Sequence, residues 1–153
     1  MRVLTSAVPV ETETRVTNHF VLPQGLIGFR DYSHAELLYL PDHLPFLWMK
    51  LTNPEGDSVH FVVIEPGGII PDYEPELFEN DAAVLEVHGA RDTMVLNIVT
   101  IDQDRPLDAK VNLIGPIIVN RRTKIGRQLV IANYSNYSAH YALVSSTPVA
   151  ASA

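Results

Sequence analysis

The 153 residues of this chain include no cysteine. Disulfide bonds, catalysis by a thiolate and zinc sites built from thiolates are therefore excluded. No apolar run approaches the ~20 residues needed to cross a bilayer, and the first residues lack the apolar core of a signal peptide. We therefore expect a cytoplasmic protein that does not enter the membrane.

Familiar catalytic and cofactor-binding motifs are also missing. The sequence has no Gly-x-Ser-x-Gly elbow, no phosphate-binding loop and no dinucleotide fingerprint. None of the six histidines has the spacing of paired metal ligands, and Asp102-Gln-Asp104 is better explained as a turn before Arg105-Pro106. We therefore expect no catalytic site, no metal and no cofactor.

Basic residues are scarce relative to acids, with 11 Lys and Arg against 18 Asp and Glu and a net charge of −7. This balance disfavours nonspecific nucleic-acid binding, which depends on Lys and Arg neutralising phosphates. It favours an encounter with a basic protein. With 46% hydrophobic residues, we expect one domain over residues 1–144, a monomer, and a disordered tail at 145–153.

The sequence predicts no long helices, because eleven prolines and eight glycines interrupt the chain. Residues 75–80 are the one expected helical turn, with proline in its first turn and acids that complement the helix dipole. Short apolar or alternating runs rich in Val, Ile, Leu and aromatics predict about ten strands. These runs are residues 2–8, 14–22, 26–29, 36–40, 46–51, 59–64, 83–87, 94–101, 109–119, 128–132 and 141–144.

The strand count and spacing predict an all-β fold. Specifically, they indicate an antiparallel, partly open β-barrel-like single domain with at most one or two short helical turns. Within the long run at 109–119, Gly115 and Pro116 predict a bulge, a corner or an edge. Residues 121–126 then form a polar connector, so we expect two strands joined by a basic turn.

Two charge clusters offer candidate binding surfaces. Residues 72–81 hold five acids and are either a solvated loop or a docking surface, with Tyr73, Leu77 and Phe78 as apolar anchors. We identify Tyr73, Glu74 and Glu76 as candidate partner contacts. The second cluster, Arg121, Arg122, Lys124 and Arg127, lacks interleaved aromatics, so a charged hairpin turn explains it better than an RNA site.

Several motifs in a fixed order carry a resemblance to a known family. They are Phe20-Val-Leu-Pro-Gln-Gly25-Leu-Ile-Gly28-Phe29, the pair Pro45-Phe46, the strand at 94–101, Val111-Asn-Leu-Ile-Gly-Pro-Ile-Ile-Val-Asn120 and Gly126-Arg-Gln-Leu-Val-Ile131. Together they resemble the flagellar assembly factor FliW family. The resemblance assigns structural roles to Phe20, Gly25, Gly28, Phe29, Pro45, Phe46, Leu113 and Pro116.

The same motifs contain further candidate partner contacts, which are Asn112, Asn120, Arg127 and Gln128. For the two asparagines, satisfying backbone groups at strand ends is an equal alternative. Three departures from the family pattern stand out: Ile27 replaces a proline, Gly115 replaces an alanine, and Trp48-Met49-Lys50 replaces Leu-Gln-Ser. The last of these bears on partner specificity.

The resemblance implies a compact β-barrel-like fold and a non-enzymatic cytoplasmic regulator. Members bind flagellin and the translational repressor CsrA in a partner switch that relieves repression of flagellin mRNA. Two alternatives stay open: a small-ligand barrel or uncharacterised enzyme lined by Trp48, His60, Tyr73 and His88, and an RNA-binding barrel using residues 121–127.

Overall fold

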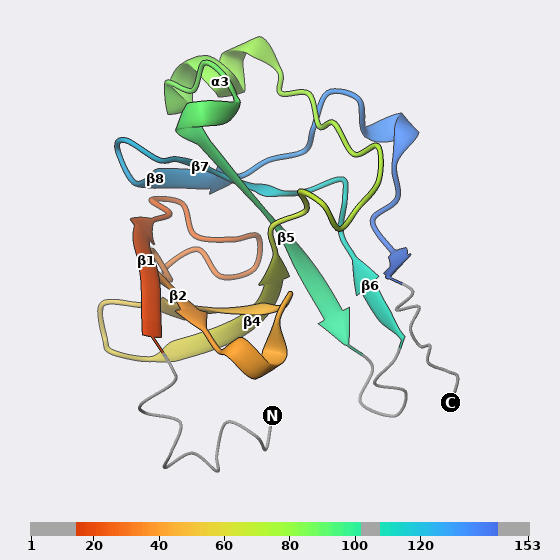
Figure 1. Ribbon diagram of the computed structural model, residues 1–153. Helices are drawn as coiled ribbons and strands as arrows, with labels where there is room; N and C mark the ends of the chain where they lie inside the picture. The colour runs from red at the N-terminus through yellow and green to blue at the C-terminus, as the bar shows by residue number, and fades with distance from the viewer. Residues whose placement is uncertain (1–14, 102–107, 144–153) are drawn as a thin grey trace, which may run out of the picture.

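The structure is a computed structural model that describes residues 15–101 and 108–143 (Figure 1). The strand expected at 2–8, the turn at Asp102-Gln-Asp104 and the tail at 145–153 lie outside the described residues. Nine strands are described: β1 (Arg15–Val21), β2 (His34–Tyr39), β3 (Leu47–Thr52), β4 (Ser58–Ile64), β5 (Thr93–Ile101), β6 (Ala109–Val111), β7 (Ile117–Asn120), β8 (Ile125–Gln128) and β9 (Tyr141–Leu143).

Helical segments are short, as expected. One α-helix, α3 (Glu79–Leu85), and three 3₁₀ turns, η1 (Pro41–His43), η2 (Ala90–Asp92) and η3 (Tyr134–Asn136), occur in the described part of the chain. No helix there has the length and apolar character required to span a membrane.

Seven strands close into a barrel. Their order is β4-β3-β2-β1-β8-β7-β5, and β5 pairs back with β4 to complete the circuit. Strands β6 and β9 extend the sheet from the far half of β5. All pairings between the described strands are antiparallel except β1 with β8, which meet at the single pair Val21↔Ile125. The predicted fold class, an all-β antiparallel barrel with short helical turns, is confirmed.

Side chains fill the barrel interior. Phe20, Leu22, Met49, Leu51 and Leu96 are all buried, and Leu37, Met94, Ile117 and Val119 join them in one cluster. Gly126 faces the same interior, where an added Cβ would stand 2.8 Å from Val119 Cγ2 and 2.9 Å from the Ile118 carbonyl oxygen. Among the described residues, apolar side chains thus occupy the barrel interior, which counts against the small-ligand alternative.

The loop after β1 is built by the glycine motif. Gly25 has a φ of 61°, and a Cβ there would collide with the backbone carbonyl of Phe29. This turn brings Phe29 against the interior cluster, edge-to-face with Phe61 at 5.2 Å. Residues 26–29 are therefore a tight turn closed by a bridge between Leu26 and Phe29, and the expectation of a strand there is wrong.

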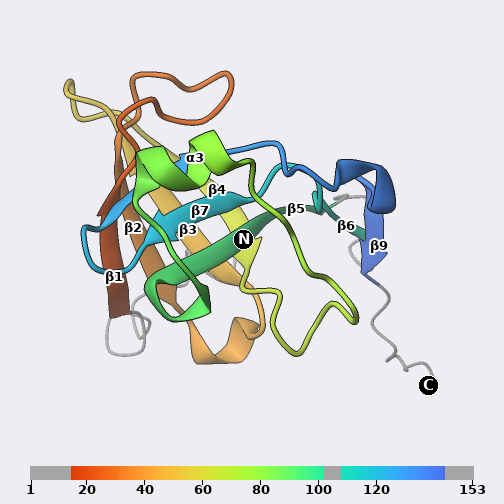
Figure 2. The same cartoon turned by 90° about the horizontal axis from the view of Figure 1, so that it is seen from above.

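The expectation of a strand at 83–87 is also wrong, because α3 occupies most of that run. The helix expected at 75–80 begins later, at Glu79. A five-residue apolar run cannot distinguish a strand from a helix by periodicity, and tertiary packing decides. Leu85 and Val87 pack on Ile118 and Leu129, so the helix covers the outer side of β7 and β8 (Figure 2).

Gly115 and Pro116 divide the run at 109–119 into two strands, β6 and β7, so they form a corner. Pro116 and Leu113 are buried at this corner, and Phe46 packs on the neighbouring cluster of Ile64, Val111 and Leu113. The basic connector is the turn between β7 and β8, as predicted. The following strand is β8, which ends where the run expected at 128–132 begins.

A candidate protein-docking cleft

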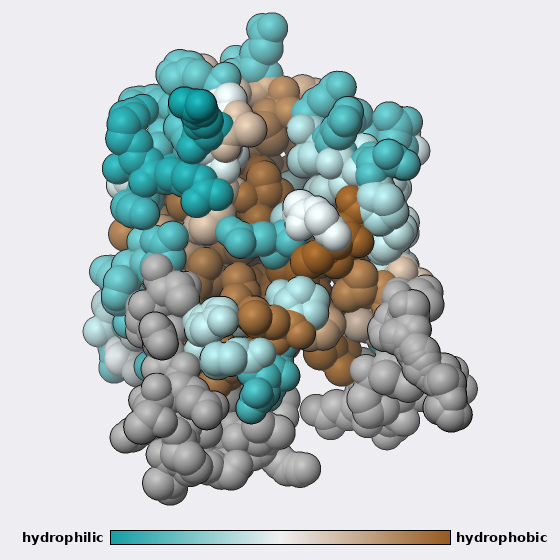
Figure 3. Space-filling model, viewed as in Figure 1, coloured by the Kyte–Doolittle hydropathy of each residue, from teal (hydrophilic) through white to brown (hydrophobic). Residues whose placement is uncertain are grey.

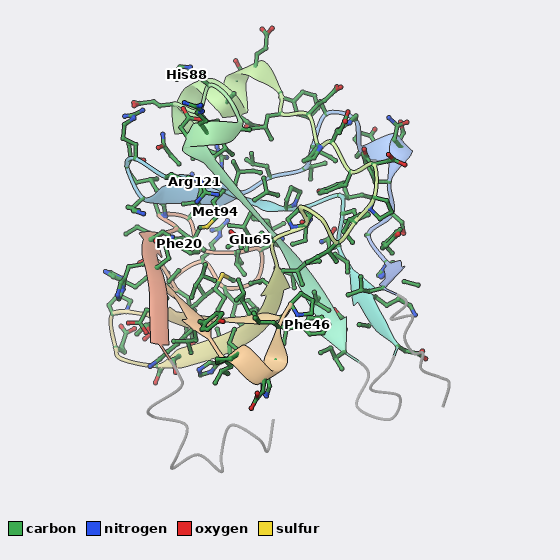
Figure 4. All side chains as sticks on the ribbon, in the orientation of Figure 1. Phe20, Phe46, Glu65, His88, Met94 and Arg121 are labelled. Carbon is green, nitrogen blue, oxygen red and sulfur yellow. The ribbon has the colours of Figure 1, made fainter. Side chains whose placement is uncertain are left out.

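β5 crosses the front face of the barrel in Figure 1. A cleft with two hollows lies on this face. The hollows lie on either side of the turn at residues 65–68, and both are lined by Glu65, Gly67 and Arg121. We call them the acidic hollow, of about 580 Å³, and the barrel-mouth hollow, of about 570 Å³. Figure 4 places Arg121, Met94 and Glu65 together near the middle of this face.

The barrel-mouth hollow exposes part of the apolar interior. Leu37 and Met94, which are only 2% exposed, contribute to its lining together with Leu47 and Ile69. On the side of β1, Asn18 reaches Met94 Sδ at 4.0 Å and accepts a hydrogen bond from Lys124 Nζ at 3.3 Å. On this side of the barrel, β1 and β8 share only the register pair Val21↔Ile125. Figure 3 shows hydrophobic side chains gathered in the middle of this face, with hydrophilic ones on both sides.

The acidic hollow has three exposed carboxylates in its lining, those of Glu65, Asp72 and Glu74. Arg121 is the one basic residue in that lining. Tyr73, Val95 and Ile70 supply an apolar floor between the charges. An excess of negative charge around apolar side chains favours a basic protein partner.

Tyr73 holds the acidic loop in place. Its hydroxyl donates to the Leu113 carbonyl at 2.7 Å and accepts from Asn97 Nδ2 at 3.1 Å, and its ring meets Tyr137 edge-to-face at 5.0 Å. Burial raises the pKa of Tyr73 to about 12, against the smaller opposing effect of the Asn97 hydrogen bond. Tyr73 therefore positions the loop, and only part of its ring lies at the surface of the hollow.

Glu74 and Glu76 are fixed through their backbones. The Glu74 amide donates to the Tyr137 hydroxyl at 2.9 Å, and the Glu76 amide donates to Asn133 Oδ1 at 2.9 Å. Asn133 Nδ2 donates in turn to the Glu74 carbonyl. Both carboxylates stay exposed, and that of Glu74 belongs to the acidic hollow.

Arg121 lies between the two hollows and belongs to the lining of both. Its backbone amide donates to the Asp92 carbonyl at 2.8 Å, while its exposed side chain has no ion pair with any described residue. An arginine flanked by apolar surface is a frequent energetic centre of protein interfaces. From the sequence Arg121 is predicted to lie in a basic turn, and no local pattern indicates that it lines the same hollows as Glu65, because only the closure of the barrel brings the two residues to one face.

The two candidate asparagines bond inside the protein. Asn112 Oδ1 accepts from the amides of Ile114 and Gly115, and this bonding turns the chain at the β6–β7 corner. Asn120 is fully buried; its Nδ2 donates to the Leu85 and Glu86 carbonyls, and its Oδ1 accepts from the next turn. These bonds match the alternative in which both residues satisfy backbone groups.

Arg127 and Gln128 lie on β8, apart from both hollows. Arg127 is 4.0 Å from Asp81 Oδ1 on α3. Gln128 accepts from the Ile27 amide and donates to the Gly115 carbonyl, each at 3.2 Å. The structure therefore does not bring these two residues together with Tyr73 and Glu74.

The side chains proposed for a ligand site do not converge. Trp48 and Lys50 are half-exposed, and Lys50 faces Glu36 and His60 across the sheet. Trp48 donates to His43 Nδ1 at 3.2 Å, and burial followed by the Lys50 charge lowers the pKa of His60. Tyr73 lies in the lining of the acidic hollow. His88 lies beside α3, as Figure 4 shows. The departure at 48–50 thus lies outside the lining of both hollows, and the described residues contain no cluster able to hold a metal.

Known proteins match this chain over most of its length. The family model described as FliW protein matches residues 4–143. A flagellar assembly factor FliW from Natranaerobius thermophilus is 30% identical over 133 residues, covering 87% of this chain and 86% of the relative. One from Geobacillus kaustophilus is 34% identical over 120 residues, covering 78% and 80%. A crystal structure of the flagellar assembly factor FliW matches with a TM-score of 0.70 and 29% identity, covering 82% and 85%.

Proposed function

The chain belongs to the FliW family, and from this premise we propose that it is a flagellar assembly factor that acts by binding proteins, without catalysis. Its place of action is the cytoplasm. The ordered motifs that resemble this family and the cleft on the barrel face both support the proposal. The two hollows are lined by apolar side chains, by the carboxylates of Glu65, Asp72 and Glu74, and by Arg121, Asn18, Tyr39 and Tyr73, a mixture typical of protein contact surfaces.

The finer mechanism is a partner switch. The free protein binds a CsrA-like translational repressor and lowers its affinity for flagellin mRNA, which relieves repression. Flagellin also binds this chain, and it competes with the repressor for that binding. Such competition requires overlapping sites or two exclusive conformations.

The acidic hollow is the observation that supports this proposal most. A repressor that binds RNA carries Lys and Arg to neutralise phosphates, so its surface complements the carboxylates of Glu65, Asp72 and Glu74. The net charge of −7 adds long-range attraction to the encounter. When this chain binds basic residues of the repressor, those residues are no longer available to bind RNA.

Charge reversal in the hollow tests the proposal. We expect Asp72→Lys with Glu74→Lys to weaken calorimetric binding of the CsrA-like repressor from the same genome at least tenfold. Both side chains are exposed. The Tyr137 hydroxyl donates to the Asp72 carbonyl at 3.1 Å and accepts from the Glu74 amide, so these bonds involve only the backbones of the two acids and the fold should persist. The matched control is Glu55→Lys with Asp31→Lys, two exposed acids outside the acidic hollow.

The control pair carries the same change in net charge, so it should lose only the long-range part of the attraction. Equal losses in both pairs would assign the attraction to net charge and remove the acidic hollow from the account. A wild-type protein that binds neither the repressor nor flagellin would overturn the proposed function itself.

A further inference from the structure

A third hollow lies beneath α3 and is mainly apolar. It has a volume of about 440 Å³ and is lined by Leu77, Ala82, Val87, Val95 and Ile118, with His88 and Thr93 among the polar residues at its edge. No carboxylate or lysine belongs to its lining. We call it the helix pocket.

The helix pocket adjoins the acidic hollow. Pro75 and Val95 line both, so the two depressions share a wall. In Figure 4 His88 marks the upper end of this face, above Arg121, and Figure 3 shows hydrophobic surface extending up toward the level of α3. A single bound segment can therefore reach both depressions.

Hydrogen bonds hold the rim of the helix pocket in a fixed position. The Asp92 carboxylate accepts from the amides of His88 and Gly89, both at 3.1 Å, and the Thr93 hydroxyl donates to the Gly89 carbonyl at 2.6 Å. A pocket that is already formed costs a partner little conformational entropy on binding.

Further hydrogen bonds connect the helix pocket to the cleft. The Asp92 carbonyl accepts from the Arg121 amide at 2.8 Å, and Asn120 joins the end of α3 to the turn that carries Arg121. The rim of the helix pocket and the backbone of Arg121 are thus parts of one hydrogen-bonded framework.

We propose that the helix pocket receives an apolar side chain of the basic partner that meets the acidic hollow. The partner segment has Lys or Arg next to a leucine, isoleucine, methionine or phenylalanine. The basic residues face Glu65, Asp72 and Glu74, and the apolar side chain enters beneath α3 across the shared wall of Pro75 and Val95. Charge complementarity selects this occupant, and burial of the apolar side chain in a preformed pocket supplies affinity. This inference rests on the proposed function, with the CsrA-like repressor as the partner.

Blocking the pocket tests the inference. Ala90 is exposed and belongs to the pocket lining, so Ala90→Trp places an indole at the entrance. Ala83 is exposed on α3 and is not part of the lining, so Ala83→Trp is the matched control. We expect Ala90→Trp to weaken calorimetric repressor binding at least tenfold and Ala83→Trp to change it less than twofold.

A salt series separates the pocket from the charges. Since Ala90→Trp removes no charge, the slope of the logarithm of affinity against the logarithm of salt concentration should match that of the wild type. An altered slope would mean that the substitution disturbs the acidic hollow and would count against a separate anchor.

A second measurement uses the absence of cysteine. Ala90→Cys introduces a single thiol at the pocket entrance, and Ala83→Cys introduces one on the outer side of the helix. Saturating repressor should slow labelling at residue 90 at least fivefold and leave residue 83 unchanged. This result does not depend on whether Ala90→Trp folds.

The contrary outcomes are distinct. Repressor binding with full affinity by Ala90→Trp and unprotected labelling at residue 90 would overturn the anchor while leaving the proposed function intact. A concentration-dependent dimer abolished by Ala90→Trp, with repressor affinity unchanged, would assign the pocket to a second copy of this chain and also overturn the inference. A wild-type protein that binds neither repressor nor flagellin removes the proposed function instead.

Discussion

The side-chain amide of Asn120, on β7, donates a hydrogen bond of 2.8 Å to the main-chain carbonyl of Leu85, at the end of α3. A second bond to Glu86 and two accepted from the amides of Arg122 and Thr123 use the full bonding capacity of this buried amide. One side chain thus fixes α3 and the turn that carries Arg121 relative to each other.

Replacing Asn120 with alanine should therefore be costly. Asn120→Ala leaves two carbonyls and two amides without their partner, and we expect the free energy of unfolding to fall by about 2–4 kcal/mol. Denaturant unfolding of the variant measures this, with exposed Asn80→Ala on α3 as control, expected within about 0.5 kcal/mol of wild type. A loss of less than about 0.5 kcal/mol for Asn120→Ala would contradict its role in joining α3 to the turn that carries Arg121.

Packing of the barrel interior around Gly126 leads to a second prediction, on the stability of the fold. A methyl group there meets Val119 Cγ2 at 2.8 Å and a backbone oxygen at 2.9 Å, and the backbone cannot easily move aside. Gly126→Ala should lower the free energy of unfolding by about 1–3 kcal/mol. Gly67→Ala, where an added Cβ meets nothing within 4 Å, is the control and should unfold close to wild type.

Stability at high pH should depend on Tyr73. Its pKa is about 12 in the folded protein and near 10.0 when unperturbed, so the unfolded state loses the proton first. The contribution of the neutral hydroxyl to stability is complete below pH 10 and declines as the pH rises toward 12. Tyr73→Phe should flatten this part of the decline measured by denaturant unfolding between pH 9 and pH 11.5.

Tyr73→Phe also removes two hydrogen bonds. We expect a loss of roughly 1–3 kcal/mol at neutral pH, because the Leu113 carbonyl and the Asn97 amide lose a partner. A variant as stable as wild type at neutral pH, with an unchanged decline above pH 10, would contradict the assigned role of this hydroxyl.

Substitution of Arg121 should weaken binding of the repressor without lowering the stability of the fold. Its side chain has no ion pair among the described residues, so Arg121→Ala should change the free energy of unfolding by less than about 0.5 kcal/mol. Binding of the repressor should weaken about tenfold or more in calorimetry, because the guanidinium lines both hollows of the cleft. Arg122→Ala, an exposed neighbour outside both linings, should bind as the wild type does.

The strands were predictable from local sequence where alternation is clear. In β5, Met94 and Leu96 face the barrel interior and Val95 the outer side, as a period of two requires. The break at Gly115 and Pro116 and the basic turn before Ile125 follow equally from backbone chemistry. These signals depend on neighbouring residues only.

Other features depend on tertiary contacts and were not predictable. The run Ala83-Val84-Leu85 is apolar enough for a strand, and only the packing of Leu85 against Ile118 and Leu129 makes it helical. Glu65 and Arg121 are far apart in sequence, and no local pattern predicts that they line the same hollows. The acidic cluster at 72–81 is predictable from its charges, whereas the inward orientation of Tyr73 depends on Leu113 and Asn97.

The most direct test of the central claim is isothermal titration of this protein with the CsrA-like repressor of the same genome, with and without flagellin. The account predicts stoichiometric binding of the repressor that saturating flagellin abolishes and that Arg121→Ala weakens about tenfold. Binding that flagellin leaves unchanged would contradict the partner switch. No heat with either protein would contradict the proposed function as a whole.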